Sequence, residues 1–242
     1  MAALRAVHHK LISCPRGGRS ASNAQSPRKC SLKGKYRHLR ADGEIGPTLP
    51  FIENCIRSEI VLDGGNVVKW SDRVILTEKA LAENIGWGQK GLVAELERLL
   101  DVEQVILIPP EPGDVTGHSD GVVRFVDNGT VVVNDYRQID RNYRQAVLRR
   151  LKDAGLIVLE LPYRPASSSS AGMPSAVGNY VNFLTVRRLI VLPIYGFPED
   201  GDAREVLART NQASSVVTLD CRELASDGGV LNCASWSLKT EF

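Results

Sequence analysis

The sequence predicts an α/β fold built from repeated units, each a β-hairpin followed by a helix and a third strand. Three observations predict this fold. Short runs of β-branched and apolar residues have strand length, longer stretches carry apolar residues on one helical face, and this order recurs roughly every 55 to 60 residues. With 242 residues and 43% hydrophobic composition, the chain can fill a sizeable core.

The elements follow one another in the same order in each unit. Ser71-Asp72 forms the turn of the first hairpin, and Asn128-Gly129 forms that of the second, where both residues tolerate a positive φ. The expected hairpin strands, helix and closing strand are 66–70, 73–77, 90–100 and 105–108 in the first unit; 122–126, 130–134, 141–154 and 156–161 in the second; and 180–186, 189–193, 202–210 and 215–219 in the third.

Two architectures fit this repeat. The units could surround a common centre, with helices outside and loops converging inside, or they could form one open α/β sheet. In the first case, motifs far apart in the sequence would meet. The segment 162–175, with four successive serines, is expected to be a flexible surface loop.

The N-terminus differs in composition from the rest of the chain. Residues 1–41 contain no Asp or Glu and about ten Lys or Arg. We therefore interpret 1–33 as a basic, disordered or targeting-like segment and 34–242 as the folded domain. The composition is typical of an organellar transit peptide, and it also suits a nucleic-acid-binding arm or translation from an upstream start codon.

Cysteine usage and hydropathy indicate the cellular setting. No stretch approaches the roughly 20 apolar residues that cross a bilayer. Five cysteines, an odd number without a C-x-x-C pair, indicate free thiols in a reducing compartment. The expected location is the cytoplasm, with organellar targeting by the basic N-terminus as the alternative.

Three glycine-flanked loops carry the candidate chemistry. Asp63 stands between an apolar strand and Gly64-Gly65, a pattern that is also common in plain turns. His118 and Asp120 lie two residues apart, so in an extended segment both would face one side, and the carboxylate would hold the imidazole charged. A lone histidine is otherwise usually structural.

The third loop carries Cys233, which follows a glycine turn at 228–229 and is expected to begin a short apolar strand. Buried structural cysteine is the commoner state, and Cys55 and Cys221 lack such glycine surroundings. A Cys-His pair could serve a thiol protease or amidase. The carboxylates instead favour a cationic substrate such as a guanidinium, whose N–H groups they accept in forks.

The three loops resemble the agmatine deiminase and peptidylarginine deiminase-like family of the guanidine-modifying superfamily. The resemblance begins near Lys35 and rests on I-V-L-D-G-G-N at 60–66, G-D-V-T-G-H-S-D-G at 113–121 and G-G-V-L-N-C-A-S-W at 228–236; G-N-Y-V-N-F-L at 178–184 and L-P-I-Y-G at 192–196 are also similar. It implies the pentein fold, an α/β propeller of five ββαβ units around a pseudo-fivefold axis.

The resemblance also implies residue roles. Cys233 would attack the guanidinium carbon, His118 would protonate the leaving nitrogen and later activate water, and Asp120 and Asp63 would hold the guanidinium nitrogens. Asp114 matches a further acidic position of the motif. The implied reaction converts agmatine to N-carbamoylputrescine in putrescine biosynthesis, or deiminates peptidylarginine or arginine, without a metal or organic cofactor. The implied partner is a small guanidino molecule, not nucleic acid or a membrane, and homo-oligomerisation stays open.

The sequence departs from the family's pattern in three places. Asp63 stands where many relatives have Glu, and Asn232 precedes the cysteine where typical agmatine deiminases have His. A W-x-R-D-type segment is not found before Asp63, so the first unit is expected to be incomplete and the chain N-terminally truncated. The alternatives are therefore a catalytically impaired remnant that binds a guanidino ligand or a partner, and a nucleic-acid binder that uses residues 1–41.

Overall fold

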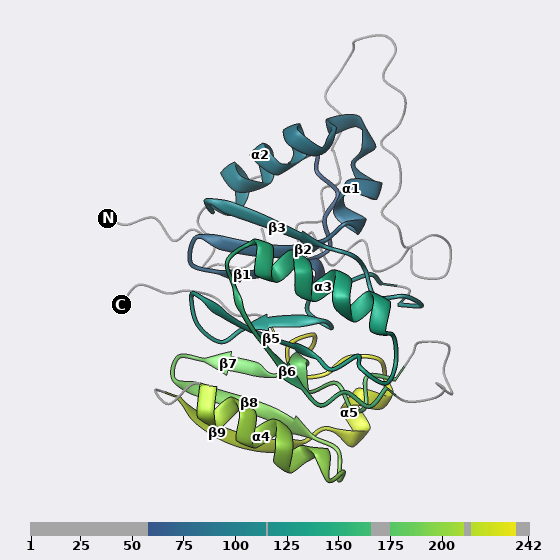
Figure 1. Cartoon of the computed structure of the whole chain (residues 1–242), viewed down its shortest axis with the longest axis vertical. Coiled ribbons are helices and arrows are strands. Elements are labelled where there is room, and N and C mark those ends of the chain that lie inside the picture. The colour runs from purple at the N-terminus through teal and green to yellow at the C-terminus, as the bar shows by residue number, and fades with distance from the viewer. Residues whose placement is uncertain (1–57, 115, 166–174, 211–213, 236–242) are drawn as a thin grey trace, which may run out of the picture. The chain divides into compact units, whose positions relative to one another are not determined.

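The computed structural model describes residues 58–114, 116–165, 175–210 and 214–235 (Figure 1). The chain divides into two compact units. Among the described residues, the smaller unit contains 58–64 and 80–101, and the larger unit contains the remainder.

The larger unit contains three separate three-stranded sheets. In each sheet a β-hairpin is joined to a third strand that runs parallel to the hairpin's second strand. The predicted ββαβ repeat is therefore confirmed. The sheets are β1 (Val68–Trp70), β2 (Arg73–Thr77) and β3 (Gln104–Ile108); β4 (Val123–Phe125), β5 (Thr130–Asn134) and β6 (Ile157–Leu161); and β7 (Leu184–Val186), β8 (Leu189–Ile194) and β9 (Ser215–Asp220).

The hairpin's second strand is the middle strand of each sheet, and it carries the most continuous apolar sequence. All five residues of β5 are buried, as expected for a strand that is covered on both faces. The three hairpins turn differently. Ser71 and Arg187 adopt positive φ values of 47° and 54°, whereas the Asn128-Gly129 turn does so at neither residue. Instead, the Gly129 N–H donates to Asp127 Oδ1 at 2.8 Å.

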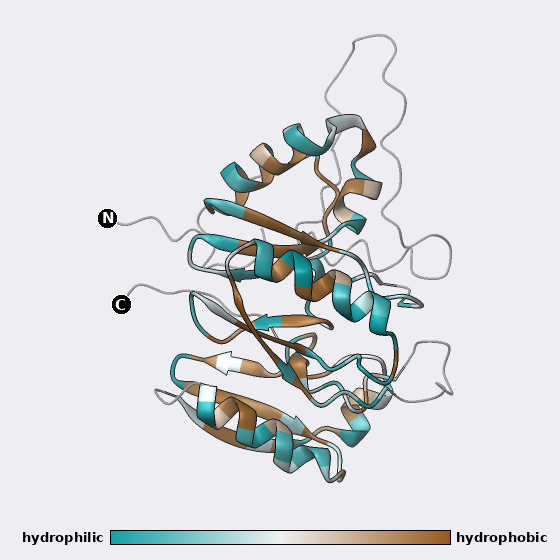
Figure 2. Ribbon diagram, viewed as in Figure 1, coloured by the Kyte–Doolittle hydropathy of each residue, from teal (hydrophilic) through white to brown (hydrophobic). Residues whose placement is uncertain are grey.

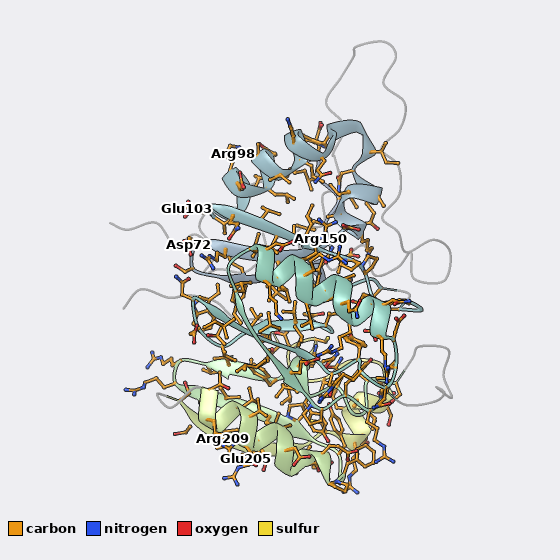
Figure 3. The ribbon with its side chains drawn as sticks, viewed as in Figure 1. Asp72, Arg98, Glu103, Arg150, Glu205 and Arg209 are labelled. Carbon is orange, nitrogen blue, oxygen red and sulfur yellow. The ribbon has the colours of Figure 1, made fainter. Side chains whose placement is uncertain are left out.

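Two crossover helices cover the sheets of the larger unit. Helix α3 (Arg141–Asp153) begins at Asp140, whose side chain accepts a hydrogen bond from the Tyr143 N–H, and packs on β3 and β6. Its buried residues are Tyr143, Val147 and Leu151, which lie on one face because they are spaced four residues apart. Figure 2 shows hydrophobic and hydrophilic residues mixed along α3, in brown and teal. Helix α4 (Glu199–Thr210) packs on β9, and its exposed Glu205 and Arg209 form an ion pair (Figure 3).

The smaller unit is organised around Asn84. The Val61 N–H donates to Asn84 Oδ1 at 2.8 Å, and Asn84 Nδ2 donates to the carbonyls of Val61 and Ala80. These bonds tie the segment that precedes Asp63 to helix α1 (Lys79–Glu83). The first residue of α1, Lys79, is assigned to the larger unit, and the rest of the helix is assigned to the smaller unit. The 3₁₀ turn η4 (Ile85–Trp87) and helix α2 (Gln89–Leu100) follow. The buried residues of α2 are Leu92, Leu96 and Leu100.

Two apolar clusters form the core of the larger unit. One contains residues of the first two sheets and of α3, such as Ile75, Val131 and Leu151. The other joins the second and third sheets to α4, as in Val132, Leu192 and Leu207. Most residues of the two clusters are buried. Removal of apolar surface from water stabilises the folded state by roughly 25 cal/mol per Å².

Local expectations were wrong in three places that concern the candidate loops. Residues 180–182 form the 3₁₀ turn η5 (Tyr180–Asn182), because the Asn182 side chain bonds a distant turn. Cys233 lies in a turn, closed by the Ala234 N–H donating to the Val230 carbonyl at 2.9 Å, and does not begin a strand. Residues 119–121 also turn, so no extended segment places His118 and Asp120 on one side, contrary to the expectation from their spacing.

Several predictions concern residues outside the described part of the chain. They include the basic segment 1–33, most of the loop 162–175, and Cys55. The domain boundary at residue 34 stays a prediction. In the ranges that the structure describes, no helix has the length and apolar character to span a membrane.

Candidate active site

The candidate site of the larger unit is built from connections between the repeated units. The 3₁₀ turn η3 (Gly64–Asn66) precedes β1, and residues 109–122 join the first sheet to the second. The turn η5 precedes the third sheet, and residues 231–234 follow α5 (Arg222–Ser226) at the end of that unit. The regular elements thus fix the ends of each connection and leave their polar side chains available for chemistry.

Asp114 braces the connection that carries His118. Its carboxylate accepts hydrogen bonds from the Thr116 N–H and hydroxyl, both at 2.8 Å, and from the His118 N–H at 3.2 Å. The Thr77 hydroxyl, at the end of β2, donates to the Gly117 carbonyl at 2.6 Å. In this structure the Asp114 carboxylate therefore organises the loop.

A buried acid lies at the beginning of the same connection. Tyr163 donates its hydroxyl to Glu111 at 3.0 Å, and Tyr136 packs edge-on against Tyr163 with ring centroids 5.1 Å apart. Burial raises the pKa of the Glu111 carboxyl to about 7, opposed by hydrogen bonds from Tyr163 and Tyr136, while the nearby Asp114 adds to the rise. The stability of this loop's anchor therefore depends on pH near neutrality.

His118 lies directly against the backbone of η3. A methyl group in place of the Gly65 hydrogen would put its carbon 2.3 Å from His118 Nδ1, far inside ordinary contact distance. The Asp120 N–H donates to the Gly65 carbonyl at 3.0 Å, which fixes the two connections to each other. Only glycine at position 65 leaves room for the imidazole where it now lies.

Asn182 orients Cys233. Its Oδ1 accepts the N–H groups of Asn232 and Cys233 at 3.1 and 3.2 Å, and its Nδ2 donates to Cys233 Sγ at 3.1 Å. Asn182 Nδ2 also donates a hydrogen bond to the Asp120 main-chain carbonyl at 3.2 Å. One buried amide thus holds the thiol and the acidic loop in a fixed relation.

The Cys233 thiol and the Asp120 carboxylate are in contact. Cys233 Sγ lies 3.6 Å from Asp120 Oδ2, which also accepts from Asn232 Nδ2 at 2.8 Å. Asp120 is 3% exposed, and this burial raises the pKa of its carboxyl, whereas His118, Arg124 and Asn232 act to lower it. The imidazole of His118 therefore lies within electrostatic reach of the same carboxylate.

Desolvation also controls the thiol. Although Cys233 presents surface to solvent, the protein atoms around its sulfur raise the pKa of the thiol to about 12, and the Asp120 charge raises it further in the same direction. The Cys233 thiol therefore favours its neutral form near neutral pH. Cys221 is buried in the apolar cluster that also contains residues of α4, outside these contacts.

The structure unites some predicted site residues and reveals others. Cys233, Asp120 and His118 belong to one neighbourhood in the larger unit, whereas Asp63 belongs to the smaller unit, immediately before η3. Sequence reasoning missed Asn182 and Arg124. The available signal was a polar residue within an apolar run, Asn182 between Val181 and Phe183 and Arg124 between Val123 and Phe125.

This arrangement suits covalent chemistry on a cation. The carboxylate beside the thiol would repel an oxyanion and attract a positive group, whose charge would in turn favour the thiolate. Among the residues that the structure describes, no group of three or more His, Cys, Asp and Glu side chains could hold a metal ion.

Comparison with known proteins points to one family. The model of the Porphyromonas-type peptidyl-arginine deiminase family matches residues 28–238. Agmatine deiminases from Stutzerimonas stutzeri and Pseudomonas putida F1 are 30% and 29% identical over 86% and 83% of this chain. The chain spans 66% and 64% of the length of these two relatives.

Solved structures agree at the level of the fold. A substrate-bound C. jejuni agmatine deiminase variant has a TM-score of 0.68 at 19% identity, covering 84% of this chain and 63% of its own. The Enterococcus faecalis agmatine deiminase has a TM-score of 0.62 at 23% identity, covering 73% and 57%. These neighbours have the α/β fold of the pentein superfamily. The chain belongs to the Porphyromonas-type peptidyl-arginine deiminase family.

Proposed function

We propose that this protein is a hydrolase of the agmatine deiminase type, which converts the guanidinium of agmatine to a urea and releases ammonia. The observation that carries the proposal is the Cys233 thiol in contact with the buried Asp120 carboxylate, in a chain of this family. The similarity to curated agmatine deiminases favours agmatine over peptidylarginine or arginine as the substrate.

Binding and activation of the thiol would occur together. Asp120 accepts guanidinium N–H groups in charge-assisted hydrogen bonds, and we assign Asp63 the same role from the motif it occupies. The bound cation lowers the pKa of the Cys233 thiol, which otherwise lies at about 12, so that the thiolate forms beside its target. The substrate would therefore help to generate the nucleophile.

The reaction would then proceed through a covalent intermediate. The thiolate attacks the guanidinium carbon, and His118 gives a proton to one NH₂ group, which leaves as ammonia. The remaining S-alkylthiouronium carries the carbon on Cys233. Water then gives one proton to His118 and attacks this carbon. As the C–S bond breaks, the thiolate leaves with its electron pair, and the new hydroxyl group loses its proton to form the urea carbonyl; this proton converts the released ammonia to ammonium. The sum is agmatine plus water giving N-carbamoylputrescine plus ammonia.

Several finer features belong to the same proposal. The repeats are arranged around a pseudo-fivefold axis, residues 34–242 form the deiminase domain, and the protein acts in the cytoplasm on a small guanidino molecule. No organic cofactor takes part in the steps above. We assign Asp114 a supporting role, because its carboxylate already accepts from Thr116 and from the His118 backbone.

Mass spectrometry after treatment with 2-chloroacetamidine, a guanidinium mimic that alkylates thiols, tests the proposal. We expect a single modification at Cys233 that agmatine blocks and that Asp120→Asn abolishes. Cys221 is the internal control, since it is buried and lies outside the contact between Cys233 and Asp120. Equal, slow labelling of Cys221 and Cys233 would contradict an assembled cation site.

Product analysis tests the chemistry itself. Agmatine, arginine and a peptidylarginine are each incubated with the protein, and ureido products are quantified, with Cys233→Ala as the inactive control. We expect N-carbamoylputrescine from agmatine and none from the variant. Binding of agmatine without any ureido product would contradict the hydrolase function and indicate a protein that only binds a guanidino ligand.

A further inference from the structure

Arg124 is a cation at the centre of the site that the reaction steps above do not use. It lies in the middle of β4, and its guanidinium is 5.6 Å above the Phe183 ring. Its Nη1 donates to Asn232 Oδ1 in a short hydrogen bond. The ring and the amide hold the guanidinium in one orientation.

The contact with Arg124 fixes the orientation of the Asn232 amide. A guanidinium only donates hydrogen bonds, so the amide oxygen must face Arg124 and the NH₂ group must face the other way. That NH₂ group lies 2.8 Å from Asp120 Oδ2. The Asn232 amide therefore transmits the position of Arg124 to the carboxylate.

Asp120 needs such support because it is almost completely buried. Burial favours its neutral form, and a neutral carboxyl cannot pair with a cation. The groups that face it are His118 on its own loop, Arg124 through Asn232, and the Cys233 thiol. Arg124 is the permanent positive charge among them, since a guanidinium does not lose its proton near neutral pH.

We propose that Arg124 and Asn232 form a relay that keeps the Asp120 carboxylate ionised and oriented for binding a guanidinium. Arg124 is thus a positioning residue, which acts on the substrate only through its neighbours. The binding role of Asp120 rests on the proposed function, whereas the effect of Arg124 on Asp120 does not.

The pH titration of Asp120 tests the relay without any substrate. ¹³C-carboxyl aspartate is incorporated, the Asp120 signal is assigned by its loss in Asp120→Asn, and its midpoint is followed by NMR. Arg124→Gln removes the charge, and we expect the midpoint to rise by about one pH unit or more. Arg124→Lys keeps the charge and is expected to remain closer to the unmodified protein.

Two further variants complete the test. Arg150→Gln removes an exposed arginine that pairs with Glu78 at 2.9 Å on the surface of α3, and it should leave the Asp120 midpoint unchanged. Asn232→Ala interrupts the relay and should raise the midpoint, which keeps the test decisive if Arg124→Gln does not fold. An unchanged Asp120 midpoint in folded Arg124→Gln, or in folded Asn232→Ala, would overturn the relay.

Kinetics separate this inference from the proposed function. In an active protein, Arg124→Gln should raise the KM for agmatine about tenfold while changing kcat less, with the acid limb of kcat/KM shifted by about one pH unit. A shifted Asp120 midpoint without turnover of any guanidino compound would retain the relay and reject the hydrolase. Turnover of agmatine together with an unchanged Asp120 midpoint in Arg124→Gln would retain the hydrolase and reject the relay.

Discussion

Substitution of Gly65 by alanine offers a direct test of the position of His118. The new methyl carbon would lie 2.3 Å from His118 Nδ1 and 2.9 Å from Cε1 and Cγ, whereas ordinary contact begins at 3.4 Å. The imidazole must therefore move by about 1 Å, and a displacement of that size at a reacting group costs roughly 100-fold in rate. This factor corresponds to about 2.7 kcal/mol of transition-state stabilisation.

The assay is kcat/KM for agmatine together with the melting temperature of each protein. We expect Gly65→Ala to lose about 100-fold in kcat/KM with little change in stability, because the imidazole can rotate about two side-chain bonds. Gly201→Ala is the matched control, since nothing lies within 4 Å of a methyl group at this position in α4. Unmodified activity in folded Gly65→Ala would show that catalysis does not need the imidazole at this position.

The remaining predictions concern the loop anchor and the thiol cradle. Burial raises the pKa of Glu111 from 4.5 to about 7, so the folded state binds this proton more tightly than the unfolded chain does. As the pH rises from 4.5 to 7, the free energy of unfolding should therefore fall by up to roughly 3 kcal/mol. Urea titrations at several pH values should show a weaker pH dependence of the free energy of unfolding in Glu111→Gln than in the unmodified protein. An equal pH dependence in the two proteins would contradict a buried acid. Asn182→Ala leaves the Cys233 N–H without its acceptor, whereas the Asn232 N–H keeps the Asn182 main-chain carbonyl at 3.2 Å, and the variant should lower stability by about 1–3 kcal/mol and slow alkylation of Cys233. Unchanged alkylation in this variant would remove Asn182 from the positioning of the thiol.

The repeated fold was predictable because its signals are local. Strand β5 and helix α3 are recognisable from a continuous apolar run and from apolar residues at helical spacing, and each is complete within a short stretch of sequence. The hairpin at Asn128-Gly129 was predicted for an incorrect reason, since the Asp127 side chain closes it without a positive φ at either residue. Several backbone conformations therefore satisfy the same turn signal.

The turns that carry the site were less predictable because distant contacts determine them. Residues 180–182 have the composition of a strand, yet Asn182 bonds residues some 50 positions later, and the chain turns to allow this. Arg124 was missed for the same reason, since its partner Asn232 lies 108 residues away. The nucleophile, the histidine and the aspartate could be named from motifs, but their supporting contacts exist only in three dimensions.

The placement of the site on the connections between repeats has a consequence for the order of folding. The bond between Asp120 and Cys233 joins residues 113 positions apart, whereas the β1–β2 hairpin pairs residues only a few positions apart. Closing a long loop costs more chain entropy than closing a short one, so the hairpins and their helices can form before the connections meet. During synthesis, Cys233 also emerges after all three sheets. The reactive centre is therefore among the last parts of the molecule to assemble, and it should be among the first to open when the packing between repeats loosens.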